Sequence, residues 1–469
     1  MHQIFYTSDL LNEIFLYLSR HTRTVTARVC KLWFTHSIQF LWDSASVNDI
    51  LEIISPFNKL QCRRIEYAAL RQALFLRPKV DLFSSKLTVL YWDGLSKHIE
   101  YLSPLVTSTL QVLKVQLDKI ESPDMLDVFC KTIPLRSPSL RSFQFGFPAA
   151  NDNTQAVSRS LAQLFLLLSD LFSIQLPYHC ITGELFTALS RLSQLQDLSL
   201  PGFCFLLMSR DDAVEMLPKR KVDNDEEKGK DIPFRSLEKI HISKSNFMMA
   251  EVLRRDIQLP KLVDLTYSDP SPDYTISSPF FESLQRTCPN LKKISISSYH
   301  GLPFQAIRSL LKCPALVEIV SDRNVNMRLE DVVTMATDRS SWQVIRLPSA
   351  KPLNYQALVP FAKNCPNLYE LSLTLDSKLG IPELDNTDVR FSSLTSLHII
   401  GDSSEPTPDF ELALFLSKIC SKPIKITGYH KLWKTVEKLV NTIITAQLEN
   451  RRLKDENTIL HARKCNHDF

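Results

Sequence analysis

A short sequence motif, called here a phrase, recurs along most of the chain. Apolar residues occupy its first, fourth and sixth places. The alternation of the fourth and sixth places is the pattern of a β-strand with one buried face. Most phrases begin 23 to 31 residues after the one before, and one step is 42 residues long. The first places are Leu87, Leu110, Leu140, Leu171, Leu195, Leu237, Leu262, Leu291, Leu316, Trp342, Leu368 and Leu394. A period of this length predicts stacked copies of one structural unit.

The segments between the phrases have a second periodicity. In residues 279–286, 303–311, 329–336 and 355–362, apolar residues stand three and four places apart, as on one face of a helix. Each unit is therefore predicted to be a strand followed by a helix, and neither element can bury its apolar side alone. This is the pattern of a leucine-rich repeat solenoid, an α/β fold with a parallel sheet and outer helices.

Three units share a cysteine and a proline just before the phrase, at Cys288, Cys313 and Cys365. The proline ends the preceding helix, so the cysteine falls on the last helical turn. A thiol that recurs at one place of a repeat is predicted to be a small buried hydrophobe and not a nucleophile or a metal ligand.

One interval between phrases is longer than the rest. Residues 210–232 are charged and poor in large apolar residues, which predicts a loop inserted between repeats. The basic triplet at 219–221 is either part of this solvated loop or a nuclear import signal. The solenoid is predicted to span residues 87–425, after a linker and capping region at 46–86.

The first 45 residues have a different pattern. Residues 7–9 (TSD) form a helix-start signal, and apolar residues at helical spacing follow them. Three blocks stand in order, at 9–18 (DLLNEIFLYL), 29–33 (VCKLW) and 41–42 (LW). In sequence and spacing these blocks resemble the F-box. With the repeats that follow, the chain resembles the F-box proteins with C-terminal leucine-rich repeats of fungi.

The resemblance implies that residues 1–45 form a three-helix module that docks on the Skp-type adaptor of an SCF cullin–RING ubiquitin ligase. Two positions depart from the family line: Thr7 replaces a proline, and Asp9 replaces a glutamate. A plain helical cap on the end of the solenoid would fit the same apolar spacing, and both interpretations stay open. The adaptor-binding residues implied by the resemblance are Tyr6, Thr7, Leu10, Leu11, Ile14 and Phe15.

The C-terminal segment at 431–464 lacks glycine and predicts one long helix. With Val436 at place a of a heptad, places a and d form a seam that fits a parallel homodimer, in which asparagine at a fixes the register. Glu449 at g would then face Lys454 at e of the second copy. A single amphipathic helix folded back as a C-terminal cap is the alternative, and it stays open. The predicted dimer seam is Val436, Leu439, Ile443, Asn450, Leu453, Asn457 and Leu460.

Composition narrows the range of functions. The net charge of +4 implies no bulk attraction to nucleic acid or membrane. Ten cysteines without a C-x-x-C pair, and no signal-peptide pattern, predict a cytoplasmic or nuclear protein with reduced thiols. No two of the nine glycines lie closer than 19 residues, which excludes the P-loop and G-x-S-x-G. We therefore expect no enzymatic activity, cofactor or metal site.

Function is expected on the concave side of the sheet. Places three, five and seven of each phrase face that side, and aromatic and planar cationic groups most often anchor interfaces. The expected substrate-binding face is centred on Tyr91, His241, Arg346 and His398. The sequence thus predicts a substrate receptor of an SCF-type ligase that binds an unknown protein. The alternative is a scaffold or dimeric interaction protein outside any ligase.

Overall fold

The computed structural model describes residues 44–46, 87–94, 99, 102–103, 105–148, 153–201, 233–243, 258–269, 278–298, 301–376, 379–383, 389–400, 410–428 and 431–465. Most of the F-box-like segment (1–43), the linker (47–86) and the inserted loop (210–232) lie outside the described residues. The six adaptor-binding residues between Tyr6 and Phe15 therefore stay predictions.

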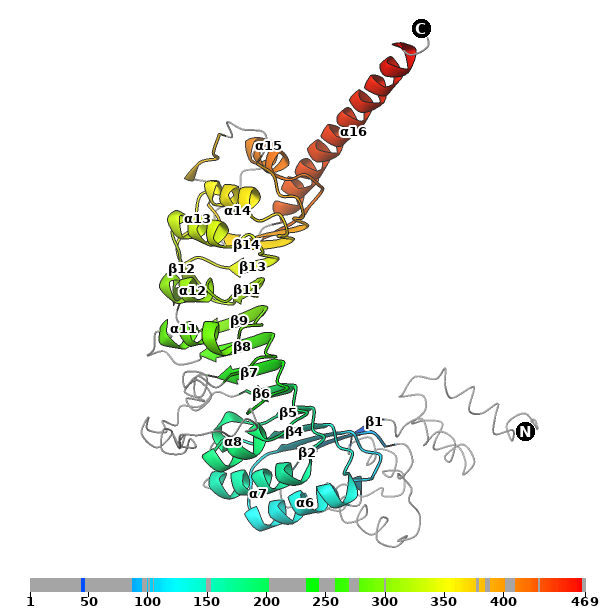
Figure 1. Cartoon of the computed structure of the whole chain (residues 1–469), viewed down its shortest axis with the longest axis vertical. Helices are drawn as coiled ribbons and strands as arrows, with labels where there is room; N and C mark the ends of the chain where they lie inside the picture. The colour runs from blue at the N-terminus through cyan, green and yellow to red at the C-terminus, as the bar shows by residue number, and fades with distance from the viewer. Residues whose placement is uncertain are drawn as a thin grey trace, which may run out of the picture. The chain divides into compact units, whose positions relative to one another are not determined.

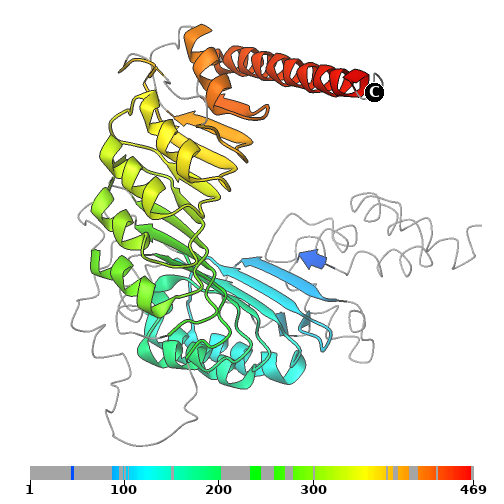
Figure 2. The ribbon, with the colours of Figure 1, turned by 45° about the horizontal axis from the view of Figure 1, so that its top comes forward.

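The chain divides into two compact units, Met1–Ile240 and His241–Phe469. The described residues of both units form parallel strands with helices between them, so the predicted α/β leucine-rich repeat fold is confirmed. Figures 1 and 2 show this ribbon from two directions.

In the first unit the strands follow one another in the sheet in chain order. Fourth-place residues stand opposite one another, as Leu113 does to Leu90, Phe143 to Leu113, and Ile174 to Phe143. The strands are β1 (Ser44–Ser46), β2 (Val89–Gly94), β3 (Val112–Leu117), β4 (Ser142–Gly146), β5 (Ser173–Gln175), β6 (Asp197–Leu200) and β7 (Lys239–Ser243), of which β7 crosses the unit boundary. The helices are α6 (Pro123–Arg136), α7 (Thr154–Leu167), the 3₁₀ turn η4 (Tyr178–Cys180) and α8 (Gly183–Ser190).

Strand β1 precedes the first phrase recognised in the sequence. It pairs in parallel with β2, with Ala45 opposite Leu90. The sheet therefore begins inside the segment assigned to the F-box-like module, at its last two residues. Helix starts in this unit follow local signals: Pro123 opens α6, and the Thr182 side chain accepts a hydrogen bond from the Leu185 amide at the start of α8.

In the second unit the sheet order is β8 (Asp264–Asp269), β9 (Lys293–Ser298), β11 (Glu318–Ser321), β13 (Val344–Leu347), β14 (Glu370–Thr374), β15 (Ser396–Ile400) and β16 (Lys425–Gly428). A small second ladder joins β10 (Leu302–Pro303) to β12 (Val325–Asn326). The helices are α11 (Ser278–Thr287), α12 (Phe304–Leu310), α13 (Leu329–Asp338), η5 (Tyr355–Ala357), α14 (Leu358–Asn364), α15 (Phe410–Ile419) and α16 (Trp433–Cys465). In Figure 1, helices α11 to α14 lie on one side of the strands.

The core of the repeats consists of the residues that the apolar pattern predicts to be buried. The residues at the first, fourth and sixth places of all twelve phrases are buried. Ser321 is the polar member of this set, and its hydroxyl donates to the backbone carbonyl of Arg323 at 2.8 Å, which satisfies it. Because every strand adds three side chains in register, each repeat buries its apolar face against its neighbours.

The cysteines of the repeats lie at a turn that precedes each strand. The amides of Leu291, Leu316 and Leu368 donate to the carbonyls of the cysteines three residues earlier. All three thiols are buried. Burial raises the pKa of Cys288 to about 12, of Cys313 to about 11 and of Cys365 to about 12, so they stay protonated at neutral pH. The prediction of small buried hydrophobes is confirmed.

Arg339 occupies this cysteine place in the repeat that begins at Trp342. Its guanidinium is buried and lies 5.7 Å from the Trp342 ring centroid. It donates to backbone carbonyls of the preceding repeat: Leu311 at 2.8 Å, Leu316 at 2.5 Å, Pro314 at 3.4 Å, and Cys313. One side chain thus supplies donors to the carbonyls of Leu311, Pro314 and Leu316 at a helix end and turn, and a second donor to the Cys313 carbonyl, which also accepts from the Leu316 amide.

Helix α16 closes the C-terminal end of the second unit. The predicted solenoid boundary at residue 425 falls at the start of β16, the last strand of the sheet. The Asn441 side chain accepts from the Ile424 amide and donates to the Ile424 carbonyl, both at 2.9 Å, and Glu437 accepts from the Ile426 amide at 2.8 Å. These contacts occupy backbone groups that an edge strand would expose.

The first half of α16 is packed and its second half is not. Trp433, Val436, Val440 and Ile444 are buried, so this half follows the cap interpretation. Val436 belongs to the predicted dimer seam, but it is completely buried in the cap and cannot also face a second copy. Figure 2 shows the second half of α16 extending away from α15.

Candidate protein-binding face

The polar face of the second unit is set by the register of its strands. Third-place residues Glu318, Val344 and Glu370 stand opposite one another on neighbouring strands. At the fifth place, Arg346 on β13 is followed along the sheet by Ser372, His398 and Thr427. Because the core takes the first, fourth and sixth places, strand alternation puts these residues on the other sheet face, where Arg346 is exposed but Val344 and Ser372 are buried.

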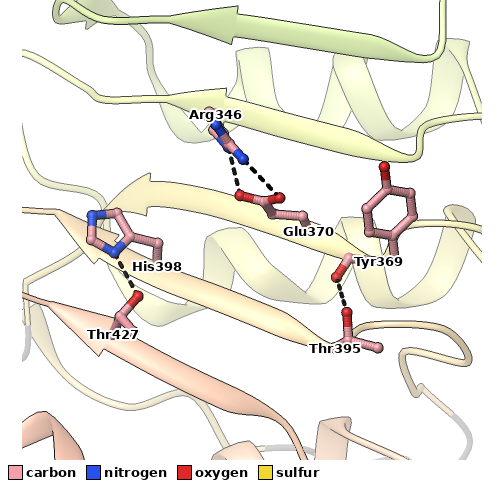
Figure 3. A network of polar contacts seen from close by, with 6 residues as sticks. All are labelled: Arg346, Tyr369, Glu370, Thr395, His398 and Thr427. Atoms are coloured by element: carbon pink, nitrogen blue, oxygen red, sulfur yellow. Dashed lines mark hydrogen bonds and ion pairs between the residues drawn. The ribbon is translucent and has the colours of Figure 1, made fainter. Parts of the chain in front are cut away.

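Arg346 and Glu370 form the best-defined contact on this face. Nε of Arg346 lies 2.5 Å from Oε1 of Glu370, and Nη2 lies 2.9 Å from Oε2, so the pair is bidentate (Figure 3). The hydrogen bond to Glu370 raises the pKa of Arg346. A solvent-exposed pair contributes only about 1 kcal/mol or less to stability. Its main effect is to hold the guanidinium plane in one orientation.

Tyr369 stands beside this pair, one place before β14 begins. Its side chain is 39% exposed, a large area for an aromatic ring. Partial burial and the nearby carboxylates of Glu318 and Glu370 raise the pKa of Tyr369. The residue thus offers an aromatic surface next to an oriented guanidinium, and both groups are common anchors of protein interfaces.

His398 continues the face along β15. Its Nδ1 lies 2.7 Å from the Thr427 hydroxyl on β16. Burial, followed by the positive charge of Arg346, lowers the pKa of His398. The imidazole is therefore neutral at neutral pH, and its hydrogen bond to Thr427 fixes the ring on the surface.

The predicted face residues are distributed over both units. The structure brings Arg346 and His398 into one cluster around Glu370. Tyr91 belongs to the first unit, where it is 40% exposed and Lys114 Nζ lies 4.9 Å from its ring centroid. His241 is partly buried on β7, where the two units meet in sequence.

Two members of the cluster were not predicted. Glu370 is at the third place of its phrase, which the alternation rule puts on this face, but a carboxylate was not among the residue types expected to anchor an interface. Tyr369 is at the second place, which that rule leaves out. Tyr369 precedes the first residue of β14, so it lies outside the strand to which the alternation rule applies.

The cluster combines an oriented guanidinium, an exposed tyrosine and a hydrogen-bonded histidine on one sheet face. The described residues contain no group of three His, Cys, Asp or Glu side chains arranged to hold a metal ion. No helix in the described part of the chain has the length and apolar character needed to cross a membrane. We name the cluster of Arg346, Tyr369, Glu370 and His398 the anchor patch.

Comparison with known proteins shows only distant likenesses. No family model matches the sequence, and no curated protein sequence matches it. The chain is similar to a solved complex of TLR13 with the single-stranded RNA ssRNA13, at 14% identity and a TM-score of 0.39, over 76% of this chain and 48% of that one. It is also similar to the yeast complex of Rad7 and Elc1, at 14% identity and a TM-score of 0.37, over 80% of this chain and 94% of that one. The chain thus spans about half the length of the TLR13 chain, and likenesses this weak show neither family nor partners.

Proposed function

We propose that the chain is a substrate-recognition subunit of an SCF-type cullin–RING ubiquitin ligase. In this role residues 1–45 bind a Skp-type adaptor, and the repeats bind a target protein. The chain performs no chemistry itself and needs no cofactor. It acts by holding the target close to other subunits, in the cytoplasm or the nucleus.

The adaptor half of the proposal rests on the three F-box-like blocks. They stand in the family's order and spacing, and they precede a repeat array in the same chain. Leu11 and Ile14 are three residues apart, which puts them on one face of the predicted first helix. The same face holds Leu10, Phe15 and Leu18 at helical spacing, as a docking helix requires.

The target half rests on the anchor patch, which is the observation that carries the binding role. A bidentate arginine, an exposed tyrosine and a neutral histidine lie together on a sheet face that the helices leave uncovered. Planar groups held by neighbours lose little conformational entropy on binding. The patch is therefore suited to binding a protein surface.

Proximity labelling in cells tests both halves with full-length variants. We expect the wild-type protein to label an adaptor and a cullin, and the double variant Leu11→Asp/Ile14→Asp to lose both by at least about tenfold, because charges cannot enter an apolar interface. The variant Arg346→Ala/Tyr369→Ala should keep the adaptor and lose the target protein. Val333→Ala, on the exposed side of α13, is the matched control and should change neither.

The scaffold alternative gives a different result. A repeat protein outside any ligase would label no adaptor, and Leu11→Asp/Ile14→Asp would leave its labelled partners unchanged. Loss of the target in the Arg346→Ala/Tyr369→Ala variant without any adaptor signal would support binding by the repeats and overturn the ligase role.

A further inference from the structure

The second half of α16 has apolar side chains without an intramolecular partner among the described residues. From Leu448 to Leu460 every residue is exposed. Leu448 is 42% exposed, Leu453 51%, Ile459 54% and Leu460 55%. An isolated helix of this length is marginal in water, because helix formation relies mostly on packing of an apolar face.

These apolar residues divide into two stripes. Leu453 and Leu460 are seven residues apart and continue the line of Ala446, so they lie on one face of the helix. Leu448 and Ile459 are eleven residues apart and lie about 120–140° around the helix from Leu453, at 3.6 residues per turn. Neither stripe continues the buried face of Val436, Val440 and Ile444, since Arg451, Lys454 and Thr458 occupy that direction.

We infer that the stripe of Ala446, Leu453 and Leu460 is the d line of a parallel two-stranded coiled coil with a second copy of this chain. Asn450 and Asn457 take the a places between them. Asparagine at a pairs with its twin across a parallel dimer, which fixes register and excludes higher oligomers. The seam begins where the cap ends, so Val436 is not part of it, and Leu439 and Ile443, which are half-buried on the packed half of α16, precede it.

The charges beside the seam select the parallel orientation. Glu449 at g faces Lys454 at e of the second copy in a parallel pair, which places opposite charges together. In an antiparallel pair the g places face each other, so Glu449 and Glu456 would bring carboxylates together. Arg452 already binds Glu456 within the helix, with Nε 2.9 Å from Oε1, and this pair lies beside the seam without crossing it.

Sedimentation velocity of the full-length protein tests the coiled coil. We expect the wild-type protein to form dimers at micromolar concentration and the variant Leu453→Glu/Leu460→Glu to be monomeric, because each d layer would then bury two carboxylates. The matched control is Leu448→Glu/Ile459→Glu, which removes equally exposed apolar residues off the seam and should stay dimeric. Circular dichroism should show that both variants stay folded, since all four residues are on the exposed half of α16.

The same experiment can overturn the inference. A wild-type protein that stays monomeric over this range, or that forms trimers, would contradict it. So would equal loss of dimer in the two double variants, since that would move the contact away from the seam.

A cysteine at position 450 tests the orientation. In a parallel, in-register dimer the two copies of place 450 meet, so Asn450→Cys should form a disulfide-linked dimer under mild oxidation. Wild-type protein treated in the same way is the control for the chain's own ten cysteines. Dimers that form without this cross-link would contradict the parallel arrangement.

Discussion

Replacing Arg339 by methionine is expected to lower the free energy of unfolding of the repeats by about 3–5 kcal/mol, the size typical of removing one partner from a buried charged contact. The side chain is buried, and its guanidinium donates to carbonyls of Leu311, Cys313, Pro314 and Leu316. Each carbonyl left without a donor costs about 1–3 kcal/mol when water cannot reach it.

Methionine keeps most of the apolar contacts of the arginine stem, so the change isolates the hydrogen bonds. Urea unfolding followed by circular dichroism and tryptophan fluorescence measures the effect, with Trp342 beside the substituted side chain. Arg339→Lys should recover only part of the loss, because an ammonium cannot present the planar fork that reaches several carbonyls.

Arg346→Met is the matched control for this prediction. Arg346 is an arginine of the same unit with a bidentate partner, but it is exposed, so its loss should cost about 1 kcal/mol or less. Equal destabilisation by the two substitutions would contradict a structural role for Arg339 as the link between repeats.

Ending the chain after Gly428 is expected to make the protein insoluble. This truncation removes α16 and with it the buried side chains of Trp433, Val436, Val440 and Ile444, each of which contributes about 1.5–3 kcal/mol. It also frees the backbone groups of Ile424 and Ile426, at and just before β16, that Asn441 and Glu437 now bind. An uncovered edge strand pairs readily with other chains, so aggregation should accompany the loss of stability.

The matched truncation ends the chain after Gln447. It keeps all four buried side chains and both edge contacts, and it removes only the exposed half of α16. We expect soluble protein with an unchanged urea midpoint that no longer forms dimers. The measurements are the soluble fraction after expression and the unfolding midpoint. Equal solubility of the two truncations would show that α16 does not cap the sheet.

The sequence predicts the repeats well because each phrase repeats one physical requirement. The residues at places one, four and six must be buried in every repeat. A polar residue at one of these places does not disturb the period of the others. Ser321 shows this, since it keeps its place in the core with a hydrogen bond in place of an apolar contact. The helices α11, α12 and α13 also lie where the three- and four-residue spacing predicts them.

The two ends of the sheet and the anchor patch were harder to predict. Strands β1 and β16 do not follow the apolar spacing of the twelve repeats. They are recognised as strands through their pairing with β2 and β15. Arg339 stands at a position that is cysteine in three other repeats. The reason for an arginine there is visible only in the structure, where its guanidinium binds backbone carbonyls of the preceding repeat. Tyr369 and Glu370 join the patch through contacts between neighbouring strands, which a single phrase does not contain.

Calorimetric titration of purified full-length protein with a Skp-type adaptor tests the central claim most directly. The proposal predicts saturable one-to-one binding that Leu11→Asp/Ile14→Asp abolishes and Arg346→Ala/Tyr369→Ala leaves intact. Thr7→Pro, which restores the family's proline at the helix entry, should tighten it, because the fixed backbone angle lowers the cost of ordering the helix start. No binding by the wild-type protein at adaptor concentrations that saturate a known F-box protein, or equal binding by the Leu11→Asp/Ile14→Asp variant, would contradict the account.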